Sequence, residues 1–265
     1  MSQAITRSAY ANIGDAQVHY RYAGGAGHAV VCFHQTPLSS RMYERALPYL
    51  GRNLRAFAFD TPGYGGSTPL TGEPTVAGFA RQMVEAIDAI GLARVAVCGF
   101  ATGSAVAAEV ARQIGDRATH LILSGTPVLS EARMKMFADR LGEPNLSDAG
   151  DHLQQVWDSR VENFGRGGDL EQVQMAVSET LRVYDRYHWG LLAVSRYDLR
   201  ATLRGSNLPA LFITAEHDKL AAENREAAQL VKDAREIVMA GALPQVCWTD
   251  PKRYAEEVVR FIGAP

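Results

Sequence analysis

Short apolar runs that recur along the chain most constrain what it can fold into. Such runs, with no polar residue at every second position, are typical of strands buried on both faces of a parallel sheet. Helical patterns fill the intervals between them, and alternating strands and helices predict a parallel sheet with right-handed crossovers. The runs are Ala29–Phe33, Arg55–Phe59, Val95–Cys98, Leu121–Leu123, Ala210–Thr214 and Glu236–Met239. The sequence therefore predicts an α/β fold.

One long interval lacks a buried strand. From about Leu129 to Leu203 the chain shows helical patterns rich in aromatic residues. We interpret residues 129–204 as a helical cap over the mouth of the sheet, and residues 1–128 and 205–265 as the α/β core. At the start of the core, Tyr10–Ile13 and Gln17–Tyr22 are expected to pair as an antiparallel hairpin.

Composition limits the classes of partner. The chain has 265 residues, 47% of them hydrophobic, and a formal net charge of −2. There is no basic run, so we expect neither nucleic acid nor a membrane surface as a partner. The first residues carry no apolar signal segment, and no stretch approaches the length that spans a bilayer, so a cytoplasmic protein is expected. A homodimer is left open.

Cysteine spacing and glycine motifs suggest no cofactor. The three cysteines form no Cys-x-x-Cys pair, and no cluster of residues has metal-ligand spacing. No strand ends in the Gly-x-Gly-x-x-Gly pattern that binds dinucleotides. We therefore expect no disulfide, no metal and no organic cofactor, with a small molecule as the partner.

The run at Val95–Cys98 leads into Gly99-Phe100-Ala101-Thr102-Gly103. The spacing of the two glycines is that of Gly-x-Ser-x-Gly, a sharp strand-to-helix turn that holds a nucleophilic side chain in a strained position. Alanine stands in the middle position here. Because a methyl group cannot attack a carbonyl, the turn keeps its shape without the atom that performs the chemistry.

Four segments, in order along the chain, resemble the α/β-hydrolase superfamily. They are His34–Ser40, Asp60–Ser67, Gly99–Gly103 and Phe212–Asp218. The resemblance covers nearly the whole chain. It implies a mostly parallel central sheet flanked by helices, a helical cap inserted between strands 6 and 7, and Asp218 as the acid of the catalytic triad.

Two departures from that superfamily bear on mechanism. Ala101 replaces the nucleophile, and no histidine follows His217, although the general base of the family lies in the turn after the last strand, here Met239–Gln245. A serine hydrolase needs a base within hydrogen-bond reach of its hydroxyl. Some similar sequences carry His-Thr-Gly at this turn, so a histidine at position 101 would place an imidazole beside Asp218.

The resemblance also implies an anion-stabilising pair of amides. The amide of Thr102 would lie at a helix N-terminus, which favours negative charge, and the amide of Thr36 would face it across an oxyanion hole. Asp218 is the leading catalytic candidate, with a helix cap as its alternative role. His34 is a second candidate, although in most members its ring orders the loop.

Other candidates would bind the substrate. These are Gln35 and Phe100 beside the turn, and Tyr184, His188, Trp189 and Tyr197 in the cap. The cap aromatics fit a packed core equally well, because aromatic side chains are common both in cores and in ligand sites.

Three hypotheses about function follow. The first is a hydrolase or lyase that acts on a small, partly apolar carbonyl compound without the Ser-His-Asp mechanism. The second is a serine- or histidine-dependent hydrolase in which an engineered alanine stands at position 101. The third is a non-catalytic protein that binds a small molecule in the same pocket.

Overall fold

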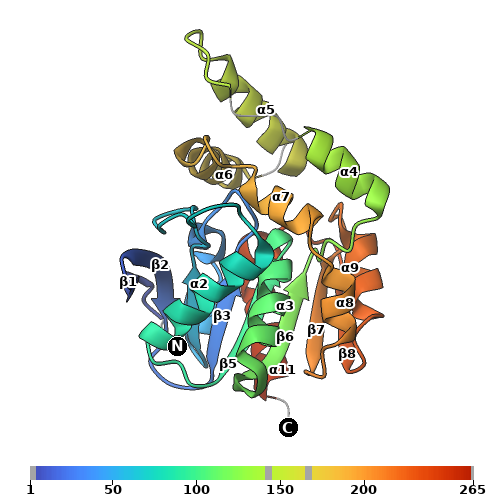
Figure 1. Ribbon diagram of the computed structural model, residues 1–265. Helices are drawn as coiled ribbons and strands as arrows, with labels where there is room; N and C mark the ends of the chain where they lie inside the picture. The colour runs from blue at the N-terminus through green and yellow to red at the C-terminus, as the bar shows by residue number, and fades with distance from the viewer. Residues whose placement is uncertain (1–3, 141–144, 165–168, 264–265) are drawn as a thin grey trace.

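The computed structural model describes residues 4–140, 145–164 and 169–263. Its centre is an eight-stranded sheet in the order β1-β2-β4-β3-β5-β6-β7-β8 (Figure 1). The two N-terminal strands pair antiparallel as predicted, β2 also runs antiparallel to β4, and all other neighbours are parallel. The strands are β1 (Arg7–Ile13), β2 (Ala16–Ala23), β3 (Ala29–Phe33), β4 (Arg55–Phe59), β5 (Val95–Phe100), β6 (Ala118–Ser124), β7 (Ala210–Ala215) and β8 (Ala234–Met239). The predicted fold class is confirmed.

The last strand corrects one expectation. We predicted that Glu236–Met239 would be buried like the other runs, but Glu236 and Val238 in β8 are exposed. The reason is position, since β8 is an edge strand with β7 on one side only. The central strands β3, β5 and β7 are buried along their whole length.

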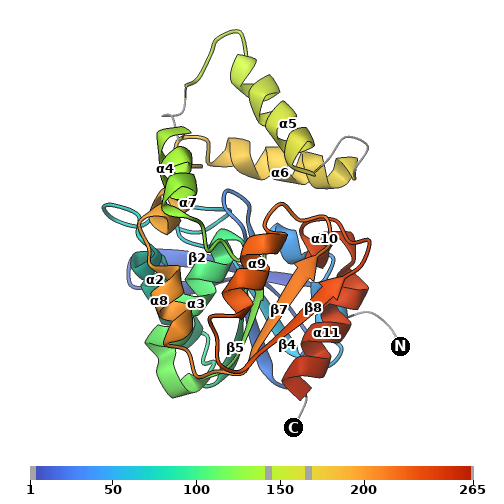
Figure 2. The ribbon, with the colours of Figure 1, turned by 90° about the vertical axis from the view of Figure 1, so that its right-hand side faces the viewer.

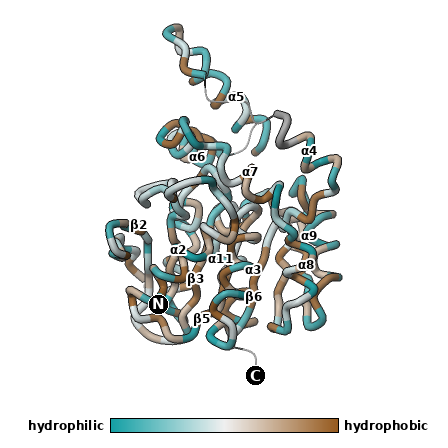
Figure 3. Tube along the Cα trace, in the orientation of Figure 1, coloured by the Kyte–Doolittle hydropathy of each residue, from teal (hydrophilic) through white to brown (hydrophobic). Residues whose placement is uncertain are grey.

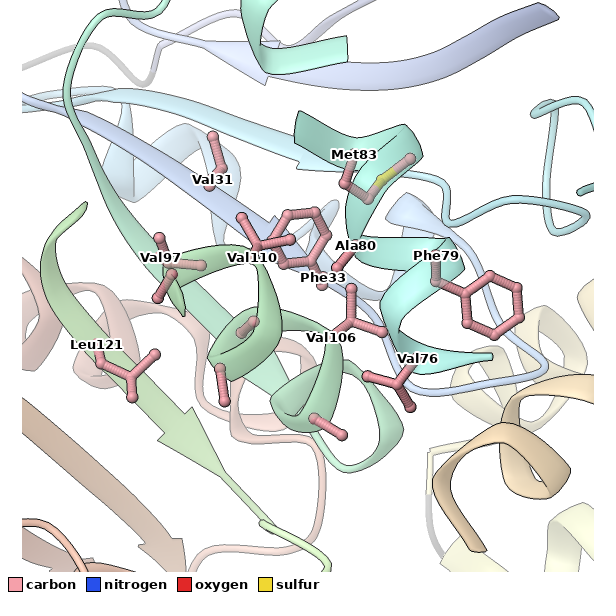
Figure 4. Close-up of a cluster of buried hydrophobic side chains, with 14 of the residues drawn as sticks. Val31, Phe33, Val76, Phe79, Ala80, Met83, Val97, Val106, Val110 and Leu121 are labelled. Atoms are coloured by element: carbon pink, nitrogen blue, oxygen red, sulfur yellow. The ribbon is translucent and has the colours of Figure 1, made fainter. Parts of the chain in front are cut away.

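Two hydrophobic cores cover the two faces of the sheet. One lies beneath α2 and α3, where Phe79 and Met83 from α2 meet Val106 and Val110 from α3 over Phe33 of β3 (Figure 4). The other lies beneath α1 and α11. The helices of these layers are α1 (Leu47–Leu50), α2 (Val76–Ala89), α3 (Thr102–Ile114), α9 (Ala221–Ala228), α10 (Val246–Thr249) and α11 (Pro251–Gly263), with short 3-10 turns η1 (Ser40–Tyr43) and η2 (Gly115–Arg117).

In the described residues between β6 and β7 the chain forms five helices. Four of them, α4 (Glu131–Arg140), α5 (Asp151–Phe164), α6 (Leu170–Arg182) and α7 (Trp189–Ser195), lie beyond the carboxyl ends of the strands (Figures 1 and 2). The fifth, α8 (Leu199–Arg204), packs beside α3 with Leu203 fully buried, so it belongs to the core layer although it falls in the range 129–204. Parts of that range, 141–144 and 165–168, lie outside the described residues.

Polar contacts join the inserted helices to the core. Asp169, which caps α6, accepts hydrogen bonds from Arg45 Nη1 at 2.7 Å and from Trp248 Nε1 at 3.0 Å. The amide of Gly190 in α7 donates to the Tyr64 hydroxyl at 2.7 Å. Figure 3 shows hydrophobic residues along the strands and a mixture of hydrophilic and hydrophobic residues along α5. The inserted helices are thus held to the core by polar bonds as well as by apolar residues, such as Val173 and Val194, that join its hydrophobic clusters.

Candidate active site

The turn between β5 and α3 is strained at Ala101. Its backbone has φ 50° and ψ −118°, a region that L-residues rarely adopt. The two flanking glycines are required by close backbone contacts. A Cβ on Gly99 would lie 2.2 Å from the carbonyl oxygen of Gly103, and one on Gly103 would lie 2.1 Å from that of Phe33. The sequence motif therefore produces the sharp turn for which its spacing is known, with a methyl group at its tip.

A cavity of about 380 Å³ opens over this turn. It lies at the carboxyl ends of the strands, where open α/β sheets bind their ligands. Six residues named from the sequence line it together, namely Gln35, Thr36, Phe100, Ala101, Thr102 and Asp218. A larger hollow of about 570 Å³ lies at the amino ends of the strands, and none of these six residues lines it.

Asp218 lies in the turn after β7 and is partly buried. Its Oδ1 accepts a hydrogen bond from the amide of Leu220 at 2.8 Å. Burial raises the pKa of this carboxyl above its ordinary value, because desolvation outweighs the hydrogen bond from Leu220. A carboxylate with a raised pKa is a better proton acceptor than an ordinary one.

A buried asparagine that we did not single out holds the loops around Asp218. Asn224 on α9 is fully buried, and its Oδ1 accepts from the amide of Thr126 at 2.9 Å. Its Nδ2 donates to the carbonyl of Ile213 at 3.2 Å and to the hydroxyl of Thr214 at 2.8 Å. Asn224 thereby connects the loop after β6 to β7, the strand that leads into Asp218.

The structure contradicts the expectation that the amide of Thr36 is one of two oxyanion donors. Its amide already donates to the hydroxyl of Thr102 at 2.7 Å, and the two hydroxyls lie 3.0 Å apart. Both residues are buried, so this bond satisfies an amide that would otherwise lie unpaired. Thr102 itself begins α3, and the first amides of a helix have no acceptor within the helix. Because Thr102 also lines the cavity, its amide remains a candidate oxyanion donor.

The structure argues against a catalytic role for His34. Its ring is fully buried and does not line the cavity. Nε2 accepts from the amide of Thr61 at 3.0 Å, which leaves Nδ1 to donate to the carbonyl of Gln35 at 3.0 Å. Burial lowers the pKa of the ring, so the neutral form is favoured. His34 orders the loop after β3.

The four cap residues expected to bind substrate lie outside the lining of the cavity. Tyr184 stacks on Tyr187 with ring centroids 5.6 Å apart, and His188 packs edge-on against the same ring. Trp189 packs against the core beneath α2 and α3. The hydroxyl of Tyr197 donates to Glu109 at 2.8 Å. Their aromatic character reflects packing, whereas Phe164 and Tyr187 are aromatic residues of the inserted segment that do line the cavity.

Gln245 is a site residue that sequence reasoning missed. It follows β8 with φ 59° and ψ 55°, is fully buried, and lines the cavity. Its Oε1 accepts from Gln172 Nε2 at 2.9 Å, and its Nε2 donates to Gln35 Oε1 at 3.3 Å. It lies in the segment where the superfamily resemblance places the catalytic histidine. In the sequence, the only signal that could have identified Gln245 as a site residue was its position after the last strand.

Arg160 on α5 was also missed, and it too lines the cavity. Its side chain is only 9% exposed, and desolvation lowers its pKa. A single arginine on a helix with many charged positions gave no signal in the sequence, because solvated arginines are common on such helices.

Other reactive groups are structural. The Ser104 hydroxyl donates to the carbonyls of Gly99 and Ser124 at 3.1 and 3.0 Å, within the packing of α3. Cys32, Cys98 and Cys247 are free and buried, and burial raises the pKa of the Cys247 thiol. In the part of the chain that the structure describes, no three His, Cys, Asp or Glu side chains gather as metal ligands, and no helix is long and apolar enough to cross a membrane.

Comparison with known proteins places this geometry in a family. Residues 28–251 match the family model described as alpha/beta hydrolase fold. The chain belongs to that family. It is 25% identical to a pimeloyl-[acyl-carrier protein] methyl ester esterase from Nitrosospira multiformis, over 89% of this chain and 95% of that protein. It is also 25% identical to a non-heme haloperoxidase from Rhodococcus erythropolis, over 90% of this chain and 93% of that one.

Solved structures show the same fold. The enol-lactonase from Burkholderia xenovorans superposes with a TM-score of 0.78 at 22% identity, covering 96% of this chain and 99% of the other. The bromoperoxidase from Bacillus anthracis superposes with a TM-score of 0.79 at 20% identity, covering 97% of this chain and 99% of the other. These matches span the inserted helices as well as the core.

Proposed function

We propose that this protein is a hydrolase that cleaves a small, partly apolar carbonyl compound in the cavity, with water as the nucleophile. The observation that carries the proposal is the strained backbone at Ala101, with φ 50° and ψ −118°. Such strain costs roughly 1–3 kcal/mol and persists chiefly at functional sites. The methyl group of Ala101 makes no use of this conformation by itself, so we infer that the strained turn serves a ligand in the cavity above it.

The reaction would use the residues that share the cavity. Asp218 takes a proton from a water molecule, whose oxygen adds to the carbonyl carbon. The carbonyl oxygen becomes an oxyanion, which the amide of Thr102 and the N-terminus of α3 stabilise. When the tetrahedral intermediate collapses, Asp218 returns the proton to the leaving oxygen. One water is consumed, and an acid and an alcohol are released.

The relatives support hydrolysis of a carbonyl compound. A methyl ester esterase and an enol-lactonase are among the proteins that this chain resembles. Both names describe the opening of a carbon–oxygen bond next to a carbonyl. The walls of the cavity include apolar side chains such as Phe100, Phe164 and Leu191, which fit a partly apolar substrate.

Single-turnover hydrolysis in ¹⁸O-labelled water tests the mechanism. With enzyme in excess over p-nitrophenyl butyrate, direct attack by water puts ¹⁸O into the butyrate of the first turnover. Attack by the Asp218 carboxylate would form a mixed anhydride; water that opens it at the Asp218 carbon would give unlabelled butyrate in that turnover and leave ¹⁸O in the Asp218 side chain. A lyase reaction on another carbonyl compound would release product without label from water. Either of these last results would contradict the proposal.

A non-catalytic binding protein is the second candidate. The contacts of Gln245 with Gln35 and Gln172 favour this candidate. They place amide groups where a catalytic base would act, and amides form hydrogen bonds but do not transfer protons at neutral pH. Saturable binding of an ester, with no product detected by mass spectrometry after long incubation, would support this candidate over the hydrolase.

Restoring a side-chain nucleophile tests the hypothesis that alanine replaces one. Under the water mechanism, Ala101→Ser alone gives no burst of p-nitrophenol, because no histidine follows His217 to stand between Asp218 and the new hydroxyl. The double variant Ala101→Ser with Gln245→His supplies both groups. A burst from the single variant, or a gain in turnover from Ala101→His, would favour a serine- or histidine-dependent enzyme instead.

A further inference from the structure

The Arg160 side chain is buried, and no described residue pairs with it. Its side chain is 9% exposed, and its Nε has no hydrogen-bond acceptor. Among the groups in residues 4–140, 145–164 and 169–263, none forms an ion pair or a hydrogen bond with Arg160. Burying a charge is unfavourable unless it is paired, and arginine is rarely this buried without a carboxylate. The unpaired group lines the cavity over Ala101.

The two other cations in the cavity wall are already engaged. Arg133 on α4 forms an ion pair with Glu223. Lys219 is exposed, and its Nζ donates to the carbonyl of Glu162 at 3.3 Å. Arg160 therefore differs from these two cations in being buried with no ion pair or hydrogen bond among the described residues. This contrast points to a ligand that supplies the missing acceptor.

We infer that Arg160 binds a carboxylate of the substrate, so that the enzyme acts on carbonyl compounds that carry a second, anionic group. The inference rests on the proposed function, because it places the substrate in the cavity above Ala101. A guanidinium presents its donors in a planar fork that matches the two oxygens of a carboxylate. Binding the carboxylate would fix the orientation of the substrate, with its carbonyl toward Thr102 and Asp218.

The charge available favours a carboxylate over a phosphate. A carboxylate carries one negative charge, and Arg160 supplies one unpaired positive charge. A phosphate monoester carries nearly two charges and three acceptor oxygens, which call for further donors. The groups beside Arg160 in the cavity wall are Ser159, Asn163 and Phe164, none of which is charged.

Binding of matched ketones tests the inference without requiring turnover. The probe is 4-oxo-4-phenylbutanoate, which joins an unreactive carbonyl, an apolar ring and a carboxylate. Its controls are 4-oxo-4-phenylbutanamide, which lacks the charge, and 3-oxo-3-phenylpropylphosphonate, in which a phosphonate replaces the carboxylate. By calorimetry, we expect the acid to bind roughly tenfold or more tightly than the amide, since a buried charged hydrogen bond is lost in the amide. Tighter binding of the phosphonate would overturn the choice of carboxylate.

Variants separate recognition from a structural role. Arg160→Met keeps the apolar length of the side chain and should abolish the preference for the acid over the amide. Without ligand it should raise the melting temperature, because it removes a desolvated and unpaired charge. Arg182→Gln, which removes an exposed charge on α6, should change neither quantity. A preference that survives in Arg160→Met, or a fall in its melting temperature, would overturn the inference.

The outcome is independent of catalysis. If the ketone acid binds through Arg160 but no ester is hydrolysed, the inference about the anionic group stands and the proposed hydrolase fails. If p-nitrophenyl butyrate is hydrolysed but the ketone acid has no advantage over its amide, the hydrolase stands and the role of Arg160 fails.

Discussion

At the floor of the cavity, around the turn at Ala101, side chains are bonded to neighbours, whereas Arg160 on the α5 wall has no partner among the described residues. The amide of Thr36 is bonded to Thr102, and Gln245 is bonded to Gln35 and Gln172. These contacts at the floor are made within the protein and need no ligand. The Nε of Arg160 is buried, and no described residue accepts from it. We therefore expect the floor to fix the geometry of the reaction and the wall to select the substrate.

The largest expected effect is a loss of turnover when Asp218 is replaced. Asp218→Asn keeps the size of the side chain and its bond from Leu220 but cannot accept a proton. We expect kcat for p-nitrophenyl butyrate to fall by about 10²–10⁴-fold, the usual contribution of a general base. The control is His217→Gln on the same turn, whose exposed ring should not affect kcat. Equal activity in both variants would remove Asp218 from the mechanism.

The second prediction concerns the backbone of the floor. Gly103→Ala places a methyl group 2.1 Å from the carbonyl oxygen of Phe33, and a backbone atom cannot move aside cheaply. We expect a loss of about 3–5 kcal/mol in the free energy of unfolding, measured in urea. Gly205→Ala is the matched control, because its new methyl lies no closer than 3.5 Å to another group. Similar stability of the two variants would show that the tight turn is not essential.

A smaller effect should follow from removing one hydrogen bond. Thr102→Val leaves the amide of Thr36 buried without its acceptor. We expect the free energy of unfolding to fall by about 1–3 kcal/mol, the range for an unsatisfied buried donor. Thr102→Ser keeps the hydroxyl and should lose much less. If valine were tolerated as well as serine, the floor would not depend on this bond.

The smallest expected effect is the pH dependence of stability. Because burial raises the pKa of Asp218 in the folded state, the folded protein holds this proton to higher pH than the unfolded chain does. The stabilising contribution is complete below the unfolded pKa of Asp, about 3.9, and is lost as pH rises through the folded pKa.

Asp218→Asn removes this contribution. The difference in unfolding free energy between Asp218→Asn and the original chain should therefore shift in favour of the variant as pH rises from about 3.9. The two proteins share every other ionisable group, so the difference between them isolates Asp218. Urea unfolding at several acid pH values measures it, and a difference that does not change with pH would contradict the raised pKa.

Local patterns were sufficient to predict the core and the turn. The apolar runs and the two glycines act through neighbouring residues, so the strands, the hairpin and the position of Ala101 followed from spacing alone. The same rules failed at β8, where exposure depends on being the last strand of the sheet. They also failed for Tyr184, His188, Trp189 and Tyr197, because aromatic character does not tell which side of a helix faces a cavity.

The sequence by itself determined the family, the order of the strands along the chain and the absence of a nucleophilic side chain at position 101, because each of these follows from residue type and spacing. Only the tertiary structure decided which polar groups are satisfied. It bonded the Thr36 amide to Thr102 and the Thr61 amide to the buried ring of His34, and it brought Gln245 and Arg160 to the same cavity. Those outcomes depend on segments far apart in the chain, since a hydrogen bond or an unpaired charge exists only relative to what packs around it.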